Sequence, residues 1–191
     1  LLSLLPSSSS STPPNNPTAD PADRLLTSIE NVVPDTKTGS YDMREIIAQV
    51  ADDQILTKIR KDWATNIITA LCTINGTTVG IVANQPQSLA GTLDISASQK
   101  GARFVNFCDA FNIPIITFVD TPGFQPGKDL EWRGMIRHGA QLAFAYANAT
   151  IPRICVTIRK SYGGAYIVMD SKLMGNDLAL AWPSAEIDRK S

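Results

Sequence analysis

Ile154-Cys155-Val156-Thr157-Ile158 is an apolar, β-branched run, and Lys160-Ser161-Tyr162-Gly163-Gly164-Ala165-Tyr166 follows it almost at once. The run predicts a buried strand, and the two adjacent glycines predict that this strand turns directly into a helix. The first N–H groups of a helix have no acceptor within it, and glycine lets a ligand oxygen come close to the backbone. We therefore interpret the turn as an oxyanion hole. The alternative is a tight connection chosen for packing alone.

Outward from this turn, apolar strands and amphipathic helices alternate along the chain. The residues Asn75-Gly76 between two apolar runs predict a two-residue hairpin. Alternating strands and helices with continuous apolar strands favour an α/β layer fold with a largely parallel sheet. The predicted strands are Ile67–Ile74, Thr78–Ala83, Ile113–Val119, Arg153–Ile158 and Leu178–Trp182, and the predicted helices are Ser96–Phe111, Glu131–Ala147 and one that starts at Ala165–Met169.

The N-terminal part of the chain differs in composition. Residues 7–23 are rich in Ser, Pro and Asn and bury almost nothing, which predicts a mobile segment. We expect residues 1–23 to be an interdomain linker and residues 24–191 to be one domain, the second part of a longer protein. Short helices at Arg24–Ile29 and at Asp42–Val50, the latter capped by Asp42, are expected to precede the main fold.

Charge and cysteine content narrow the class of partner. With 191 residues and a net charge of -1, the chain has room for one domain and has no basic field for nucleic acid or an anionic membrane. Its three cysteines are odd in number and include no CxxC pair, which favours reduced thiols and a cytoplasmic location. No stretch approaches the roughly 20 apolar residues of a membrane span.

Side chains that could act as nucleophile, base or metal ligand are poorly placed. Ser161 lacks the glycine two positions before it that a nucleophile elbow requires. His138, the single histidine, lies in a helical run and is expected to line a helix face or pocket. The aspartates, among them Asp120 and Asp170, are scattered, and no cluster has metal-ligand spacing, so no metal is predicted. The chemistry is therefore expected to come from backbone dipoles.

Longer blocks of sequence carry a family resemblance. They run in order and cover most of the chain outside the linker, at residues 84–86, 91–95, 100–105, 107–114, 120–124, 136–140, 162–166 and 181–187. Together they closely resemble the β-subunit of biotin-dependent acyl-CoA carboxylases, and specifically the C-terminal half of this carboxyltransferase subunit.

The resemblance implies the crotonase-like fold, a spiral of ββα units, and transfer of a carboxyl group from carboxybiotin to the α-carbon of an acyl-CoA. In the family mechanism the biotin oxyanion removes the α-proton, which agrees with the missing base. The resemblance also implies site residues. The N–H groups of Gly164 and Ala165 would be catalytic, the biotin side would comprise Tyr162, Gly163, Pro122, Gly123 and Phe124, and the acyl-CoA side would include Gly91, Thr92 and Ile167.

The resemblance further implies partners and exposes departures. Expected partners are an acyl-CoA, an α-subunit with biotin carboxylase and biotin carboxyl carrier, and further copies that assemble through dimer pairs. The family's N-terminal half is absent, so we expect this chain to be inactive alone. The sequence after Ile187 departs from the family pattern, which suggests truncation or unseen residues. Ile167 stands where propionyl-CoA-type members have aspartate, which favours a different or longer acyl group.

Two other functions stay open at this point. A hydratase or isomerase of the crotonase superfamily would need a carboxylate or another acid–base pair near the thioester, and none is evident. A non-catalytic assembly module would keep the fold for subunit contacts only. Such a module would bind no biotin, which makes biotin binding the discriminating measurement.

Overall fold

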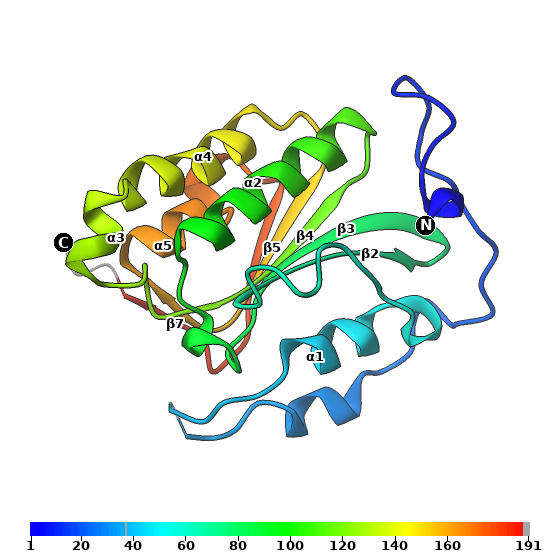
Figure 1. The fold of residues 1–191 in the computed structure, drawn as a ribbon. Helices are drawn as coiled ribbons and strands as arrows, with labels where there is room; N and C mark the ends of the chain where they lie inside the picture. The colour runs from blue at the N-terminus through cyan, green and yellow to red at the C-terminus, as the bar shows by residue number, and fades with distance from the viewer. Residues whose placement is uncertain (37, 189–191) are drawn as a thin grey trace.

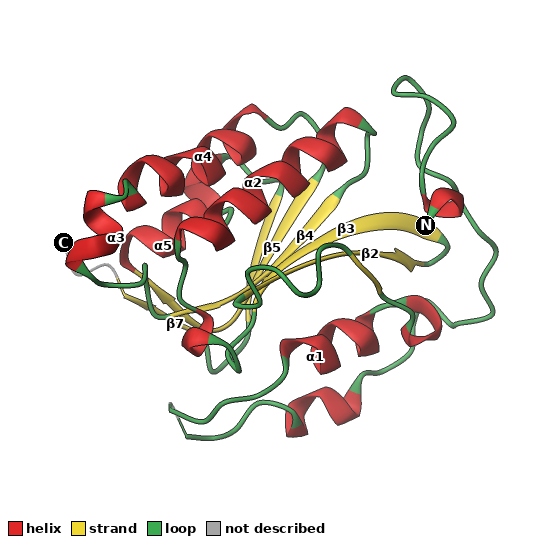
Figure 2. Ribbon diagram, viewed as in Figure 1, coloured by secondary structure: helices red, strands yellow, loops and turns green. Residues whose placement is uncertain are grey.

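A computed structural model describes residues 1–36 and 38–188, and within them seven strands form one mixed sheet (Figure 2). The strand order is β1-β2-β3-β4-β5-β6, and β7 also pairs with β5. The strands are β1 (Thr57–Lys58), β2 (Ile67–Ile74), β3 (Thr77–Asn84), β4 (Ile115–Thr121), β5 (Arg153–Tyr162), β6 (Leu178–Ala181) and β7 (Glu186–Asp188).

Helices cover both faces of this sheet (Figure 1). On one face, α2 (Ile95–Ala110), α4 (Met135–Asn148) and α5 (Gly163–Val168) bury an apolar cluster that includes Leu142 and Tyr146. On the other face, α1 (Met43–Val50) buries a second cluster. The short helix α3 (Lys128–Trp132) leads into α4. The architecture is three layers with the sheet in the middle, the arrangement expected when strands are apolar on both faces.

The pairing of the strands confirms the predicted α/β organisation. β2 and β3 are antiparallel and joined at Asn75–Gly76, with Ile74 opposite Thr77, as the hairpin signal predicts. β3, β4, β5 and β6 are parallel to one another. Because parallel strands point the same way, the segments that follow β3, β4 and β5 emerge at the same edge of the sheet.

Three differences from the predicted elements are larger than a shift of one or two residues at an end. The predicted helix Glu131–Ala147 is split into α3 and α4, because Gly134 adopts a left-handed conformation with φ of +86°. The N-terminal helix is a 3-10 helix at Thr27–Asn31 and not Arg24–Ile29. β5 extends to Tyr162, so it passes straight into α5 without a loop.

α1 is part of the main fold, which corrects the prediction that it only precedes it. Met43, Ile46 and Ile47 are fully buried in the second cluster against the sheet. The predicted cap is confirmed, since the Asp42 side chain accepts a hydrogen bond from the N–H of Arg44. An apolar stripe on a helix indicates that the helix is buried, but it does not indicate which element it packs against. The packing of α1 against this sheet could therefore not be predicted from the sequence.

The N-terminal segment contacts the hairpin and the loop that follows α2. The N–H of Asn16 donates to the carbonyl of Gly76 at 2.8 Å, and the side chain of Asn112 donates to the carbonyl of Ser9 at 2.6 Å. The mobility of residues 7–23, and the division of the chain after residue 23, remain predictions. The expected departure after Ile187 falls largely on residues 189–191, which lie outside the described residues.

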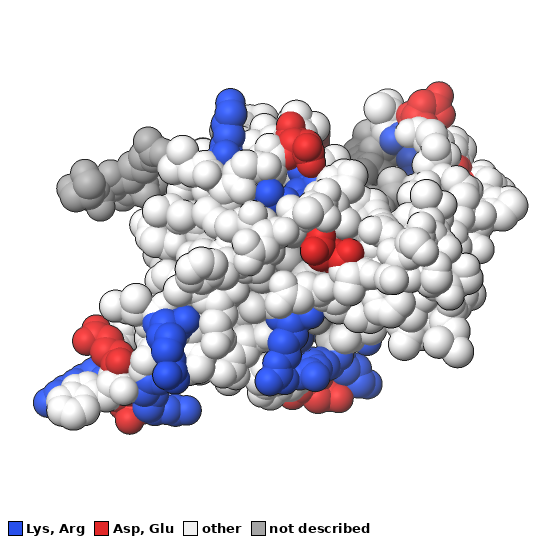
Figure 3. Space-filling view, turned by 90° about the horizontal axis from the view of Figure 1, so that it is seen from above, with Lys and Arg blue, Asp and Glu red and all other residues white. Residues whose placement is uncertain are grey.

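In the view from above, most of the face is uncharged, and Lys and Arg side chains gather along its lower edge with a few Asp and Glu among them (Figure 3). The net charge of the whole chain is -1. None of the helices in the described ranges combines the length and the apolar character that crossing a membrane would demand.

Candidate functional site

The predicted site segments meet at the edge of the sheet where three parallel strands end. β3 ends at Asn84, before the segment that contains Gly91 and Thr92, whereas β4 ends at Thr121, immediately before Pro122. β5 ends at Tyr162, immediately before the paired glycines. Ligand sites in parallel α/β sheets lie at this carboxyl edge, because the loops there converge.

The glycine turn is open, as its predicted role requires. Gly163 has φ of +57°, and a Cβ built on it would have no described atom within 4 Å. Gly163 and Gly164 are exposed, whereas Ala165 is fully buried in the apolar cluster. No loop or cap hydrogen bond in the described part of the chain uses the N–H of Gly163, Gly164 or Ala165. Of the two predicted donors, Gly164 is therefore the solvent-accessible one.

Phe124 lies against the glycine turn and wedges between two helices. A Cβ on Gly164 would lie 3.4 Å from the Phe124 ring, and a Cβ on Gly139 of α4 would lie 2.9 Å from the tip of the same ring. Thr121, just before this loop, pairs with Ser161, just before the turn. The structure thus brings together the two segments predicted for the biotin side.

The loop predicted for the acyl-CoA side joins the same region. Leu93 pairs with Phe124, and its N–H donates to the carbonyl of Gly123 at 3.1 Å. Thr92 donates its hydroxyl hydrogen to the side-chain carbonyl of Gln125 at 2.7 Å. Gly91 has φ of +76°, and a Cβ there would lie 2.5 Å from the carbonyl oxygen of Asp120, so glycine is required.

Two further predicted residues flank the turn. Tyr162 is partly buried, and its hydroxyl donates to the carboxylate of Glu186 in β7 at 2.6 Å. Ile167 follows Gly163 by four residues in α5 and therefore lies on the same side of the helix. Its side chain is 42% exposed, which is high for an isoleucine and leaves it available to a ligand.

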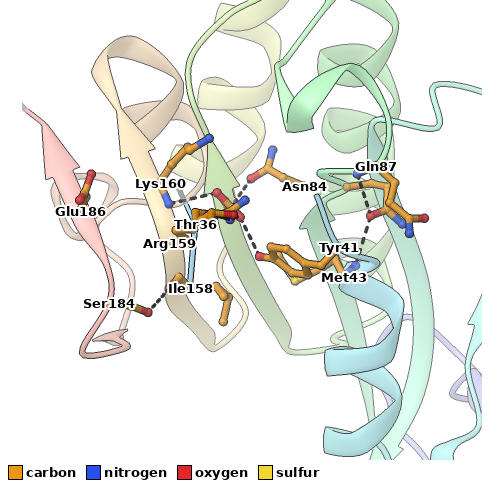
Figure 4. A network of polar contacts seen from close by, with 12 residues as sticks. Thr36, Tyr41, Met43, Asn84, Gln87, Ile158, Arg159, Lys160, Ser184 and Glu186 are labelled. Atoms are coloured by element: carbon orange, nitrogen blue, oxygen red, sulfur yellow. Dashed lines mark hydrogen bonds and ion pairs between the residues drawn. The ribbon is translucent and has the colours of Figure 1, made fainter. Parts of the chain in front are cut away.

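A buried polar network under the site was missed by the sequence reasoning. The carboxylate of Asp120 accepts hydrogen bonds from the Tyr41 hydroxyl at 2.7 Å, from Arg159 Nε at 3.1 Å and from the N–H of Lys160 at 3.0 Å (Figure 4). A cavity of about 490 Å³ opens beside Arg159 and Lys160. The sequence did contain one indication of this network. Two positive residues, Arg159 and Lys160, follow an apolar run, and a buried charge requires a partner.

Electrostatic shifts follow from burial. Burial and the adjacent Asp120 charge raise the pKa of Tyr41, which therefore stays protonated and donates to that carboxylate. A second buried ion pair joins Arg153, the first residue of β5, to Asp170, which follows α5. Burial raises the pKa of Asp170 to about 6 against the opposing effect of Arg153.

The side chains considered as base, nucleophile or metal ligand either lie away from the glycine turn or are buried. The polar contacts of the His138 ring are with Gln99, Gln141 and Arg137 on the helix layer. The Ser161 hydroxyl is fully buried and has no hydrogen-bond partner among the described residues, which argues against a nucleophile. Within the described ranges, no three His, Cys, Asp or Glu side chains gather to form a metal site.

Comparisons with known proteins identify the family and agree with the fold. The family model of the carboxyl transferase domain matches residues 1–188. The chain belongs to the carboxyl transferase domain family. Like the other members with solved structures, it has the crotonase-like α/β fold. The resemblance recognised from the sequence blocks is confirmed.

Members of the family that resemble this chain include propionyl-CoA carboxylase beta chains, a methylmalonyl-CoA decarboxylase subunit and a transcarboxylase. The propionyl-CoA carboxylase beta chain of Cereibacter sphaeroides is 51% identical over 98% of this chain and 37% of its own length. The mitochondrial beta chain of Sus scrofa is 52% identical over 96% and 34%.

A solved structure, a transcarboxylase 12S hexamer with hydrolysed methylmalonyl-CoA bound, superposes with a TM-score of 0.95 at 46% identity over 98% of this chain and 36% of its own. This carboxyl transferase domain thus spans little more than a third of each relative.

Proposed function

We propose that this chain is the biotin-facing half of a carboxyltransferase, which moves a carboxyl group from carboxybiotin to the α-carbon of an acyl-CoA. The observation that carries the proposal is the open Gly163–Gly164 turn, flanked by Phe124, at the end of β5. Membership of the carboxyl transferase domain family supports it. The proposed partners are an acyl-CoA, a separate α-subunit with biotin carboxylase and biotin carrier, and further copies of the carboxyltransferase that form dimer pairs.

The residues at the turn fit a planar urea-type ligand. Gly163 leaves open space and Gly164 is exposed, while Phe124 presents a ring beside them. Bound carboxybiotin would supply the carboxyl group and, once that group has left, the oxyanion that accepts the α-proton. The chain's part is to hold that oxygen with the N–H groups of Gly164 and Ala165, and to exclude water with Phe124 and Tyr162.

On the acyl-CoA side we propose Gly91, Thr92 and Ile167. The loop of Gly91 and Thr92 is bonded to the Phe124 loop, and Ile167 shares a helix face with Gly163. An apolar side chain at Ile167 would contact an acyl group and favour an acyl chain different from, or longer than, propionyl.

The compartment is also a proposal. Cys72, Cys108 and Cys155 are free and buried, which supports a reducing compartment such as the cytoplasm. Mammalian relatives, among them the Sus scrofa beta chain, are named as mitochondrial.

Two measurements test the proposed function. The first is biotin binding by this chain, followed through the amide resonances of Gly163 and Gly164, which we expect to shift on titration. The second uses a chimera in which this chain replaces the corresponding segment of the Cereibacter sphaeroides beta chain. We expect the chimera to transfer carboxyl groups between an acyl-CoA and free biotin.

The outcomes separate the alternatives. An assembly module would restore oligomers in the chimera but show neither biotin binding nor transfer. A hydratase or isomerase would convert enoyl-CoA substrates without any need for biotin. Either result would refute the carboxyltransferase assignment.

A further inference from the structure

β4 and β5 lose their register next to the proposed site. Val119 pairs with Thr157, and the next pair is Thr121 with Ser161. β4 advances by two residues between these pairs and β5 by four, so β5 carries two residues more. Such a bulge removes N–H groups from the regular ladder and redirects the strand that contains it. Here the redirected strand leads directly to the Gly163–Gly164 turn.

Asp120 lies opposite the extra residues and supplies the acceptor that the ladder lacks. One carboxylate oxygen, Oδ1, accepts the N–H of Lys160 at 3.0 Å. A buried N–H without an acceptor is costly, and a charged acceptor makes a stronger hydrogen bond than a neutral one. The Asp120 side chain of β4 thus holds β5 in its shifted register at Lys160, three residues before the glycine turn begins at Gly163.

The second carboxylate oxygen is held by Tyr41, which precedes α1, and by Arg159, the β5 residue next to Lys160. Asp120 Oδ2 accepts from the Tyr41 hydroxyl and from Arg159 Nε, and Arg159 also donates to the carbonyl of Thr36 at 3.2 Å. Asp120, Tyr41 and Arg159 are 1%, 4% and 7% exposed, so water does not compete for these bonds. A buried charge pair is tolerated only when its geometry and hydrogen bonds are complete, which fixes the carboxylate in one orientation.

The backbone of Asp120 is hydrogen-bonded to the end of β3, the third of the three strands. Its N–H donates to Asn84 Oδ1 at 3.2 Å, and the Asn84 amide donates in turn to the carbonyl of Gly91 at 3.2 Å. The missing side chain of Gly91 lets that loop lie directly on the Asp120 carbonyl. One residue therefore connects the ends of β3, β4 and β5, and each of these ends leads to a segment of the proposed site.

We infer that Asp120, with Tyr41 and Arg159, is a positioning group that sets the place of the Gly163–Gly164 turn relative to the Phe124 loop. The role of these residues in binding rests on the proposed function. Their effect on the two segments does not, because the hydrogen bonds exist without a ligand. A misplacement of about 1 Å in such a site can cost roughly a hundredfold in rate, so a network of this kind has functional weight.

Tyr41→Phe is the sharpest probe of the network. It removes one hydrogen bond to Asp120 and leaves the ion pair with Arg159. Removal of either Asp120 or Arg159 would instead leave the other charge buried without a partner. Tyr146→Phe is the matched control. The Tyr146 hydroxyl is also buried and makes one side-chain hydrogen bond, to Thr117 at 2.9 Å, but Thr117 lies in the middle of β4.

The experiment compares this chain with both variants by amide NMR, hydrogen exchange and biotin titration. In Tyr41→Phe we expect the Lys160 amide to exchange about tenfold faster and the affinity for biotin to fall about tenfold, the equivalent of one hydrogen bond. The amide resonances of Gly163, Gly164 and Gly123 should move. In Tyr146→Phe, the melting temperature should fall to a similar degree, while exchange at Lys160 and biotin affinity stay within about twofold of the parent.

Each result bears on one claim. If Tyr41→Phe lowers only the melting temperature, as the control does, the network is structural and the inference is overturned. If the glycine resonances and Lys160 exchange respond but the parent chain binds no biotin, the positioning of the strand ends stands and the proposed function fails. The two failures are therefore distinguishable.

Discussion

At Gly164 the important property is the missing side chain. The residue is exposed, its φ is not in the left-handed region, and an added Cβ would make only an ordinary contact with Phe124 at 3.4 Å. The fold therefore does not require glycine at this position. A ligand that approaches the N–H does require it.

We expect Gly164→Val in the chimera to lower carboxyl transfer by about 10²–10³, the usual loss when one oxyanion donor is removed, with little change in melting temperature. The branched side chain would cover the N–H without entering the core. Leu173→Val, a substitution at a 65% exposed position after α5, is the control and should keep full activity. Transfer at the parent rate in Gly164→Val would contradict the role of this N–H.

Ile167 is the residue at which we expect acyl preference to be set. Ile167→Asp replaces an apolar contact by a carboxylate, which should move kcat/KM toward shorter acyl groups by roughly 10–200-fold relative to longer ones, the range that a changed apolar contact supports. The measurement is kcat/KM for acetyl-, propionyl- and butyryl-CoA in the chimera. Equal ratios in parent and variant would show that Ile167 does not contact the acyl group.

At the scale of elements, α4 positions Phe124. The ring occupies the space that a side chain at Gly139 would need, because a Cβ there would lie 2.9 Å from the ring tip. A glycine inside a helix costs roughly 1 kcal/mol relative to alanine, so its presence in α4 needs a reason, and the ring supplies one. The helix thus sets how far the ring reaches toward the turn.

We expect Gly139→Ala to displace the Phe124 ring and weaken biotin binding by this chain about tenfold, although alanine favours the helix. In a Phe124→Ala background the same substitution should leave biotin affinity unchanged, because the steric conflict is gone. This double-mutant cycle, measured by biotin titration, isolates the contact. Additive effects of the two substitutions would mean that Gly139 acts by another route.

At the scale of the whole molecule, three buried thiols make stability depend on pH. Burial raises the pKa of Cys72 and of Cys155 from 9.0 to about 12, and raises that of Cys108 as well. Between these values the unfolded chain loses thiol protons that the folded chain keeps. The free energy of unfolding must therefore fall as pH rises through this interval.

We expect the contribution of the thiols to the free energy of unfolding, measured with urea, to be full below about pH 9 and to decline above it by up to about 1.4 kcal/mol per pH unit for each thiol. Burial lowers the pKa of Lys100 to about 8, so this lysine makes the free energy of unfolding rise with pH above that value. It opposes the effect of the thiols, but it is one group and the thiols are three. Cys72→Ala should be less stable than the parent at about pH 8, and the difference should narrow at about pH 10.5. A constant difference would show that Cys72 does not contribute to the pH dependence.

The order of strands and helices, the hairpin at Asn75–Gly76 and the strand that runs into Gly163 were predictable from the sequence. These features depend on neighbours in the chain, such as side-chain periodicity, turn residues and the missing Cβ of glycine. The segments predicted for biotin were found together because they follow parallel strands, whose ends must meet at one edge.

Only the tertiary structure decided which distant residues meet. Tyr41 stands 79 positions before Asp120, and nothing near either residue in the sequence shows that their side chains form a hydrogen bond. The register shift between β4 and β5, the place of α1 under the sheet and the wedge of Phe124 against Gly139 are of the same kind. Local patterns determine the elements because their forces act between near neighbours, whereas contacts between elements depend on how buried surfaces of complementary shape come together.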